Sequence, residues 1–294
     1  MAFENIVGND KVKQILEEVI QSGNYLHSYL FEGETGIGKI LFAKEFAKYI
    51  LEYENDLQLD NNNHPDLSII EPEGNSIKIE QIRLLQTKII EKPIISKRKV
   101  YIIDECETMT KEAQNCLLKT LEEPPEYAII ILICSNENLL LSTIKSRCTK
   151  ISFQKISNDE MKRFVETNEL FKNISDSMLY AINGSIGKAY QIKEKQELYK
   201  QLEKILENID AYDKIEFIKN AENLYKEKDS ITDALEYINV ILFKKAKADD
   251  RFLNCIQHVE KAKIKLKQNA NYDMTIDDML FHLWEEVNEN YNRS

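Results

Sequence analysis

The stretch "GETGIGKI" (residues 33–40) decides the fold because it has the spacing of a phosphate-binding loop. Such a loop reads G-x-x-x-x-G-K-[ST] and lies between a strand and a helix. Its glycines let backbone N–H groups point at phosphate oxygens, and the helix adds the positive end of its dipole. The residues of this stretch that we expect to line a nucleotide site are Gly33, Thr35, Gly36, Gly38 and Lys39.

The last position of the loop departs from this pattern. A hydroxyl group after the lysine normally holds Mg²⁺, but Ile40 places a branched alkyl group there, and Leu41 beside it is also apolar. The metal neutralises charge that develops on a transferred phosphoryl group, so its loss removes a main part of catalysis. We therefore expect at most weak binding of ATP or ADP and no efficient hydrolysis.

Apolar runs and helical patterns alternate around the loop. Nearly continuous apolar runs such as "AIIILIC" (128–134) are typical of parallel strands that helices cover on both faces. The alternation predicts a doubly wound α/β domain. We expect strands at 28–31, 66–70, 99–104 and 128–134, and helices at about 41–51, 77–90 and 111–123.

A further helix is predicted before the loop, with Asn9 as its cap and Gly23 just past its end. The polar segment 54–66 is predicted to be a surface loop. The apolar face of the first helix is expected to consist of Val12, Ile15, Leu16, Val19 and Ile20.

Two acidic residues, Asp104 and Glu105, close the predicted strand at 99–104. A carboxylate at the carboxyl end of a parallel strand, beside a phosphate loop, is placed to organise Mg²⁺, and a second one can polarise an attacking water. Taken by themselves, two solvated acids at a strand end are the simpler interpretation. The glycine loop earlier in the chain favours the interpretation as a site.

The second half of the chain has a different composition. Residues 188–294 contain neither glycine nor proline, which predicts an all-helical region because these residues punctuate turns and break helices. Apolar residues recur there at helical spacing and are expected to form ordinary bundle core. The two clearest sets are Leu202, Ile205, Leu206 and Ile209, and Ile231, Leu235, Ile238 and Leu242.

The bulk composition limits the classes of function. A net charge of −11 argues against a protein that binds nucleic acid by itself, because contacts to phosphate dominate such binding. The five cysteines form no C-x-x-C pair and the four histidines are scattered, so we expect reduced thiols and no metal site. No apolar run reaches the length of a membrane span, and no signal peptide is recognisable at the start. We expect a cytoplasmic protein.

Several motifs, in their order and spacing, resemble those of bacterial clamp-loader subunits of the AAA+ class, and above all the delta-prime type found in DNA polymerase III. They cover most of the first 150 residues, and "GSIGKAYQI" (184–192) resembles the lid motif of the same type. The segments that carry the resemblance are "FENIVGNDKVKQIL" (3–16), "LHSYLFEGETGIGK" (26–39), "HPDLSIIEPEGNSIKIEQIRLL" (64–85), "KVYIIDECETMT" (99–110), "NCLLKTLEEPP" (115–125) and "STIKSRC" (142–148).

The resemblance implies three domains and a set of partners. It implies an AAA+ nucleotide-binding-like domain at 1–153, a helical lid at 154–205 and an all-helical oligomerisation collar at 206–294. It implies assembly with motor (tau/gamma) and delta subunits, an indirect role at the sliding clamp, and primer–template DNA as a partner only within the complex. Any polymerase activity would belong to the holoenzyme, since no set of acids here suits nucleotidyl transfer.

The resemblance also implies a role for Arg147 in "SRC". There the arginine projects into the ATP site of a neighbouring motor subunit and stabilises charge on the γ-phosphate in trans. The residue type by itself would predict a surface ion pair.

The chain departs from the motor subunits at other positions. Gly187 takes the place of their lid arginine, with Lys188 beside it, and residues 51–63 lack the cysteines of a zinc module, so no zinc is expected. Either Ser135 or Asn136 corresponds to the first sensor position.

Three functions remain possible at this point. The favoured one is a stator: an interaction subunit without its own hydrolysis that lends Arg147 to a neighbour. The second is an ATP-hydrolysing motor, supported by Lys39, Asp104 and Glu105 and opposed by Ile40 and Gly187. The third is a nucleotide-binding module without turnover.

Overall fold

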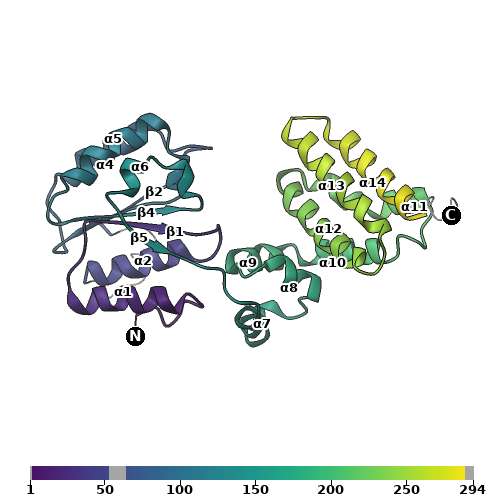
Figure 1. The fold of residues 1–294 in the computed structure, drawn as a ribbon, viewed down its shortest axis with the longest axis horizontal. Coiled ribbons are helices and arrows are strands. Elements are labelled where there is room, and N and C mark those ends of the chain that lie inside the picture. Colours follow the sequence, from purple (N-terminus) through teal and green to yellow (C-terminus); the bar gives the residue numbers. More distant parts are fainter. Residues whose placement is uncertain (1, 53–63, 289–294) are drawn as a thin grey trace. The chain divides into compact units, whose positions relative to one another are not determined.

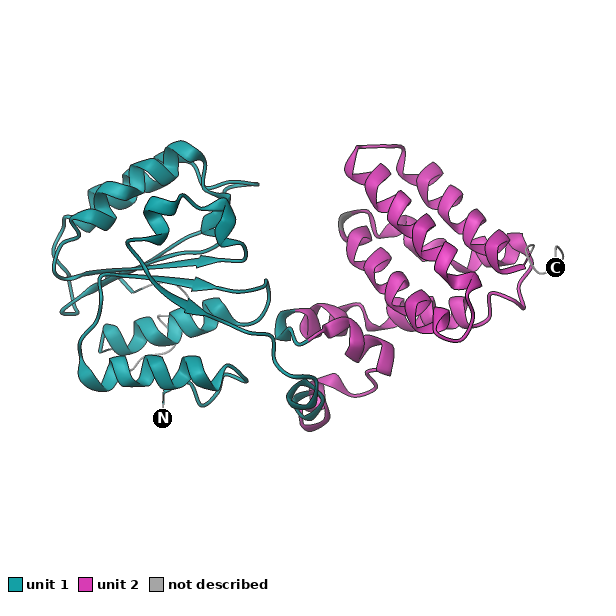
Figure 2. Ribbon diagram, in the orientation of Figure 1, with its two compact units in different colours: residues 1–164, 184–187 teal, residues 165–183, 188–294 magenta. Residues whose placement is uncertain are grey.

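The computed structural model describes residues 2–52 and 64–288, and the chain forms two compact units (Figure 2). Unit 1 comprises residues 1–164 and 184–187, and unit 2 comprises residues 165–183 and 188–294. The division of the chain into domains at 1–153, 154–205 and 206–294 stays a prediction.

A parallel sheet of five strands forms the centre of unit 1, in the order β2-β3-β4-β1-β5. Because every neighbouring pair is parallel, all strands end at the same edge of the sheet. We call this the carboxyl edge and the opposite one the amino edge. The strands are β1 (Ser28–Glu32), β2 (Leu67–Ile70), β3 (Lys99–Ile103), β4 (Ala128–Cys134) and β5 (Thr149–Ser152).

Helices cover both faces of this sheet (Figure 1). One face packs against α1 (Asp10–Ser22) and α2 (Lys39–Ile50), and the other against α4 (Ile79–Ile89), α5 (Lys111–Glu122) and α6 (Ser142–Lys145). Successive residues of a strand point to opposite faces, so the continuous apolar run of β4 supplies both cores. The doubly wound α/β fold expected from the sequence is confirmed.

Two details of the first helix differ from the prediction. Asn9 occupies the cap position, but its side chain does not cap the helix; it pairs with the backbone of Gln154, with Nδ2 donating to the carbonyl and Oδ1 accepting from the N–H. Ile15 was expected on the apolar face, yet it is 48% exposed. The predicted C-terminal end is confirmed, since Gly23 has a φ of 66° there.

The strand β5 has no counterpart in the prediction. It lies at the edge of the sheet beside β1, and only Ile151 of its four residues is buried. A short, mostly polar edge strand lacks the apolar run that identified the other four. Of the surface loop predicted at 54–66, residues 54–63 lie outside the described part.

Among its described residues, unit 2 contains helices and short 3₁₀ turns and no strand. Within it α12 packs against α8, α10 and α13, and α14 packs against α11 and α13. The two predicted apolar sets are buried, from Leu202 to Ile209 and from Ile231 to Leu242, which confirms the helical prediction. The helices after the sheet are α7 (Asn158–Thr167), α8 (Asp176–Ile182), α9 (Ile186–Glu194), α10 (Gln196–Glu207), α11 (Lys214–Asn220), α12 (Ile231–Ala246), α13 (Arg251–Lys267) and α14 (Tyr272–Asn288).

Short 3₁₀ turns connect these elements: η1 (Cys106–Thr108), η2 (Glu137–Leu139), η3 (Glu169–Phe171), η4 (Glu222–Lys226) and η5 (Lys228–Ser230). Helix α9 begins in unit 1, with Ile186 and Gly187, and continues in unit 2. Within residues 2–52 and 64–288, no helix combines the length and the apolar character that crossing a membrane requires.

Candidate functional site

The glycine loop connects β1 to α2, as the motif predicts. Gly33 follows the strand directly, and its N–H donates to the carbonyl of Cys134 on the neighbouring strand, at 3.2 Å. A side chain at Gly33 would have its Cβ 2.7 Å from the carbonyl oxygen of Phe153, so only glycine fits where β5 passes the loop. Thr35 is exposed on the loop, and Gly38, with a φ of 96°, precedes the first residue of α2.

The ammonium group of Lys39 is bound by its own loop. Nζ donates to the carbonyl oxygens of Gly33 and Glu34, both at 2.6 Å, and the residue is 7% exposed. Burial lowers the pKa of this ammonium group, and the carboxylate of Asp104 acts against the shift. The cation that would bind a terminal phosphate therefore already has acceptors in the chain.

Ile40 directs its alkyl group to the protein core. It packs against the apolar cluster between α1, α2 and the sheet, which also contains Phe42 and Phe46. No hydroxyl oxygen is present at this position for a metal ion, and Leu41 is half exposed on the same helix. The residue that breaks the motif thus has a packing role.

Asp104 and Glu105 follow β3 at the carboxyl edge. Oδ1 of Asp104 accepts a hydrogen bond from the N–H of Glu105 at 2.9 Å, and Glu105 has a φ of 46°. Burial raises the pKa of the Asp104 carboxyl group. Burial, followed by the nearby charge of Asp104, raises the pKa of Glu105. Asp104 contributes to the electrostatic surroundings of Lys39, so the fold brings this acid near the loop.

A third acid at this edge, Glu107, was not predicted. Its Oε1 accepts hydrogen bonds from both the N–H and the hydroxyl of Ser135, the N–H bond measuring 2.8 Å. Its Oε2 is buried and has no hydrogen-bond partner among the described residues. Glu107 also acts electrostatically on Lys39. The available signal was the third acid in "DECE", directly after a buried strand.

The two candidates for the first sensor position, Ser135 and Asn136, make different contacts. The hydroxyl of Ser135 is held by Glu107 at the carboxyl edge, whereas Asn136 turns its side-chain oxygen to the N–H of Asn138, at 3.1 Å, and caps η2. Of the two, Ser135 therefore shares contacts with the acids of the loop region.

Gly187 lies directly on the glycine loop. Its N–H donates to the carbonyl of Gly36 at 2.9 Å. A Cβ built on Gly187 would lie 3.0 Å from the Cα of Gly36, so a longer side chain would collide with the backbone of the loop. Gly187, which stands where the motor subunits have their lid arginine, thus brings its backbone into close contact with the backbone of Gly36.

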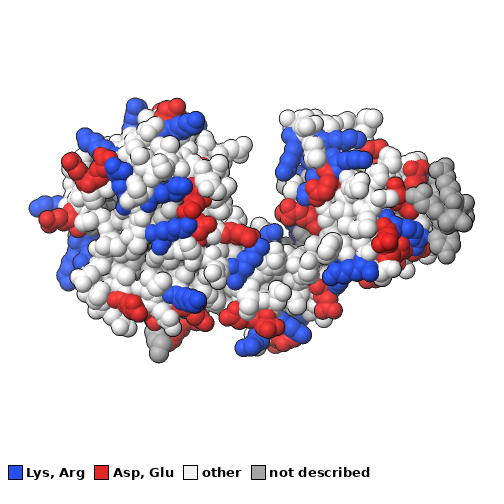
Figure 3. All heavy atoms as spheres, in the orientation of Figure 1, with Lys and Arg blue, Asp and Glu red and all other residues white. Residues whose placement is uncertain are grey.

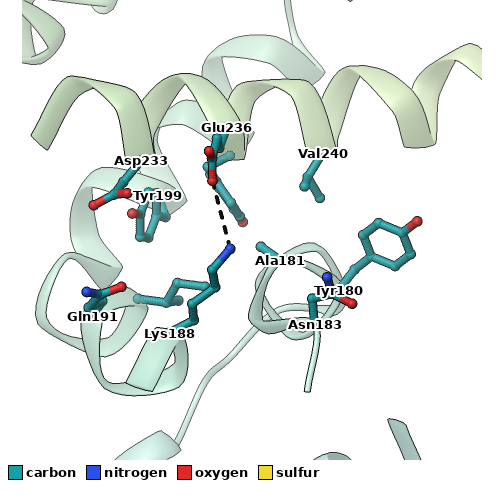
Figure 4. A pocket seen from close by; sticks show the side chains of 11 residues that line it. Tyr180, Ala181, Asn183, Lys188, Gln191, Tyr199, Asp233, Glu236 and Val240 are labelled. Atoms are coloured by element: carbon teal, nitrogen blue, oxygen red, sulfur yellow. Dashed lines mark ion pairs between the residues drawn. The ribbon is translucent and has the colours of Figure 1, made fainter. Parts of the chain in front are cut away.

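Lys188, the next residue, pairs within unit 2. Its ammonium group lies 3.9 Å from Oε2 of Glu236 on α12 and points into a pocket of about 220 Å³ (Figure 4). Tyr180 of α8, Tyr199 of α10 and Asp233 of α12 also line this pocket.

Arg147 lies at the amino edge of the sheet, between α6 and β5. NH2 of its guanidinium group donates to Oε1 of Glu122 at 2.6 Å, and NH1 donates to the carbonyl of Thr143 at 2.8 Å. Its side chain is 33% exposed. The surface ion pair expected from the residue type is therefore present, while the glycine loop and Asp104 lie at the other edge.

The length of β1 separates these two groups of residues. The hydroxyl of Ser28, the first residue of β1, donates to the carbonyl of Arg147 at 2.6 Å, and Gly33 follows the last residue of β1. Five residues of extended chain span roughly 16 Å. The guanidinium group of Arg147 therefore cannot serve the glycine loop of its own chain.

Charged side chains of both signs are intermixed on the face of unit 1 that Figure 3 shows. This face therefore offers no uninterrupted basic surface for a nucleic acid backbone.

Comparison with known proteins assigns the chain to a family. The model of the family "DNA polymerase III, delta subunit" matches residues 8–157, slightly more than half of the chain. The chain belongs to this family. The match spans all five strands of the sheet, together with the glycine loop and Arg147. The resemblance read from the motifs is confirmed.

Relatives of this delta-family chain include two proteins of Bacillus subtilis. DNA polymerase III subunit delta' is 32% identical over 209 residues, which cover 67% of this chain and 62% of the relative. DNA polymerase III subunit tau is 29% identical over 261 residues, which cover 82% of this chain and 46% of the relative. The matches therefore span less than two thirds of either relative.

A solved structure shares the fold. A gamma-subunit-related protein of DNA polymerase III from Thermotoga maritima aligns over 92% of this chain and 99% of its own, with a TM-score of 0.55 and 21% identity.

Proposed function

We propose that the protein is a delta-prime (stator) subunit of a bacterial clamp loader, which helps to place a sliding clamp on primed DNA. In this proposal it supplies Arg147 in trans to the ATP site of a neighbouring motor subunit and does not hydrolyse ATP itself. The observation that carries the proposal is the position of Arg147 at the amino edge, the length of β1 away from the glycine loop. A cation there lies out of reach of a phosphate in this chain's own loop, so only a nucleotide on another chain could meet it.

The site at the carboxyl edge supports the absence of turnover. Ile40 provides no oxygen for Mg²⁺, and Lys39 is bound by loop carbonyls. Glu107 places a carboxylate on Ser135, where it would repel a phosphate. Gly187 takes the place of an arginine that would otherwise contact the phosphate. These features weigh against the motor and support a subunit that needs no nucleotide of its own.

The partners proposed for the complex follow from the names of the relatives. Subunit tau of DNA polymerase III is among them, so motor subunits are proposed neighbours, and the resemblance of the motifs adds the delta subunit. Primer–template DNA and the clamp would be met only within that assembly, in the bacterial cytoplasm.

A reconstituted complex tests the proposal. With Arg147→Ala, we expect the complex to assemble but its DNA-stimulated ATP hydrolysis to fall, because an arginine supplied in trans is worth about 10³-fold or more at one site. The loss for the whole complex should be smaller if other sites still turn over. Lys145→Ala, which removes a nearby cation from α6, serves as the control. Lys39→Ala should have little effect on turnover.

Two results would contradict this assignment. Lys39→Ala with as large a loss as Arg147→Ala would favour the motor, as would magnesium-dependent hydrolysis of labelled ATP by the purified chain that Lys39→Ala abolishes. Retention of labelled ATP without turnover would favour the nucleotide-binding module.

A further inference from the structure

We propose that Glu122 is a positioning residue for Arg147: it fixes the guanidinium group in the orientation in which a neighbouring subunit's phosphate meets it. This inference rests on the proposed function, because it assigns to one carboxylate the alignment of the group that acts in trans. Glu122 itself would touch neither ATP nor the metal.

The backbone of Arg147 is already fixed by the sheet. Its carbonyl accepts the hydroxyl of Ser28, which is 8% exposed, and its N–H donates to the carbonyl of Ile144 at 3.0 Å. What remains free is the long side chain, whose many rotamers would each place the guanidinium group differently. Alignment of the charged end therefore depends on contacts made by the side chain.

Those contacts hold two of the three nitrogens. NH2 is held by Glu122 at 2.6 Å, and NH1 by the carbonyl of Thr143 at 2.8 Å, with the hydroxyl of Ser146 at 3.5 Å. The bond to Glu122 is the charged one, and bonds between ions are shorter and stronger than neutral ones. No acceptor is recorded for the Nε of Arg147 within the described residues, so this N–H remains available to a phosphate oxygen.

The place of Glu122 in its helix points to the same role. It is the last residue of α5, where the negative end of the helix dipole disfavours an acid. Local helix energetics therefore give no reason for a carboxylate at this position, and the pair with Arg147 offsets its cost. Buried Leu117 and Leu121 anchor the same helix to the core, so the carboxylate stands on a rigid element.

The chain provides a matched control one residue away. Glu123 is equally acidic and exposed, but its carboxylate forms no ion pair among the residues that the structure describes. Comparison of the two positions therefore separates a change of local charge from loss of the contact with Arg147.

The experiment measures DNA-stimulated ATP turnover of the reconstituted complex with Glu122→Ala, Glu123→Ala, Arg147→Ala and the double variant Glu122→Ala/Arg147→Ala. We expect Glu122→Ala to lower kcat about 10-fold, since a small misplacement of a group at the reacting centre has effects of this size or larger. The KM for ATP should stay within about twofold, because the contact acts on the transition state. Glu123→Ala should match the parent.

The double variant gives the decisive result. If Glu122 acts through Arg147, removing both side chains should cost no more than removing Arg147. Glu122→Gln, which keeps an acceptor without the charge, should fall between Glu122→Ala and the parent, and it replaces Glu122→Ala if that variant fails to assemble.

The outcomes distinguish the two proposals. If Arg147→Ala leaves turnover unchanged, the proposed function fails and the role of Glu122 fails with it. If Arg147→Ala lowers turnover but Glu122→Ala leaves it unchanged or raises it, only the positioning role is wrong. Additive losses in the double variant would also overturn it, since Glu122 would then act independently of Arg147.

Discussion

At the scale of single residues, several polar groups of the carboxyl edge have partners within the chain. Lys39 has two carbonyl acceptors, Ser135 has a carboxylate, and Gly187 is bonded to the loop. These contacts lie at the edge where the motif would place a phosphate. Loss of the metal-binding hydroxyl at Ile40 is therefore one change among several.

Restoring that hydroxyl should not restore activity. We expect Ile40→Thr to give no magnesium-dependent ATP hydrolysis by the purified chain, because Glu107 and the missing lid arginine are unchanged. Release of labelled phosphate measures this. Turnover by Ile40→Thr that Lys39→Ala abolishes would show that the hydroxyl was the only missing part.

The buried carboxyl group of Asp104 should affect how the stability of the fold depends on pH. Its pKa in the folded protein is raised above the ordinary 3.8 by burial, so ionised Asp104 destabilises the fold at pH 7. Asp104→Asn should raise the melting temperature at pH 7 by roughly 2–4 °C, the shift that about 1 kcal/mol produces in a chain of this size.

The gain from Asp104→Asn should shrink as the pH falls through the raised pKa and vanish below 3.8, where the carboxyl group is protonated in both states. Thermal melts at several pH values measure it, with Glu126→Gln in an exposed loop as the control. A gain that grows toward low pH would contradict the prediction.

Residues whose role depends on a distant partner could not be predicted from the sequence. Glu107 and Glu122 look like solvated acids, because Ser135 and Arg147 lie 28 and 25 residues further along the chain. The glycine loop was predictable because its residues are contiguous. The role of Arg147 came from family resemblance, since its residue type predicts only an ion pair.

At the scale of elements, the segment "HPD" (64–66) shows what a family motif does physically. Asp66 directly precedes β2 and is 2% exposed; it accepts hydrogen bonds from the N–H groups of Ile94, Ile95 and Ser96 at 2.7–2.8 Å. One carboxylate thereby fixes the segment that leads from α4 into β3. His64 Nδ1 in turn accepts the N–H of Asp66 at 3.1 Å.

Removing the carboxylate of Asp66 should lower the stability of unit 1. Asp66→Ala removes the buried acceptor of three backbone N–H groups, and we expect a loss of about 2 kcal/mol in the free energy of unfolding. Burial acts to raise the pKa of Asp66, but the three N–H donors outweigh it and lower the pKa below 3.8. The contribution is therefore present above pH 3.8 and lost as the pH falls through the lower folded value.

Denaturant unfolding of Asp66→Ala measures this loss, and Asp66→Asn, which keeps one carbonyl oxygen, should lose less. Equal stability of parent and Asp66→Ala at pH 7 would show that water replaces the carboxylate.

Elements were predictable where the sequence pattern was strong. The four apolar strands and the helices between them follow from runs and periodicity, and the later helices from the absence of glycine and proline. Strand β5 was not predicted because only Ile151 of its four residues is buried, so the strand lacks an apolar run. The cap at Asn9 failed because a tertiary contact with Gln154 competes for its side chain.

At the scale of the whole molecule, the proposed function gives the two edges of one sheet different tasks. In that proposal the carboxyl edge holds a loop without turnover, and the amino edge presents Arg147 on a backbone held by Ser28. A parallel sheet makes this division possible, because every strand start lies at one edge and every strand end at the other.

The net charge gives a prediction for the isolated protein. Because the chain has a net charge of −11 at pH 7, it would neutralise few DNA phosphates. We therefore expect the isolated chain not to bind primed duplex DNA at physiological salt. Fluorescence anisotropy with a labelled primer–template measures this, and the assembled complex serves as the positive control. Submicromolar affinity of the isolated chain would reveal a segregated basic surface.

The contacts of Lys39 have a consequence for behaviour in the cell. A protein that binds a ligand only when folded is stabilised by that ligand's concentration. In the proposed function this chain uses no nucleotide, because the buried cation of Lys39 already has backbone carbonyls as acceptors, and it would gain nothing in this way. Its folding stability would then be independent of the ATP and ADP concentrations in the cell. A shortage of ATP would slow the proposed clamp loader, while this subunit would keep its folded structure.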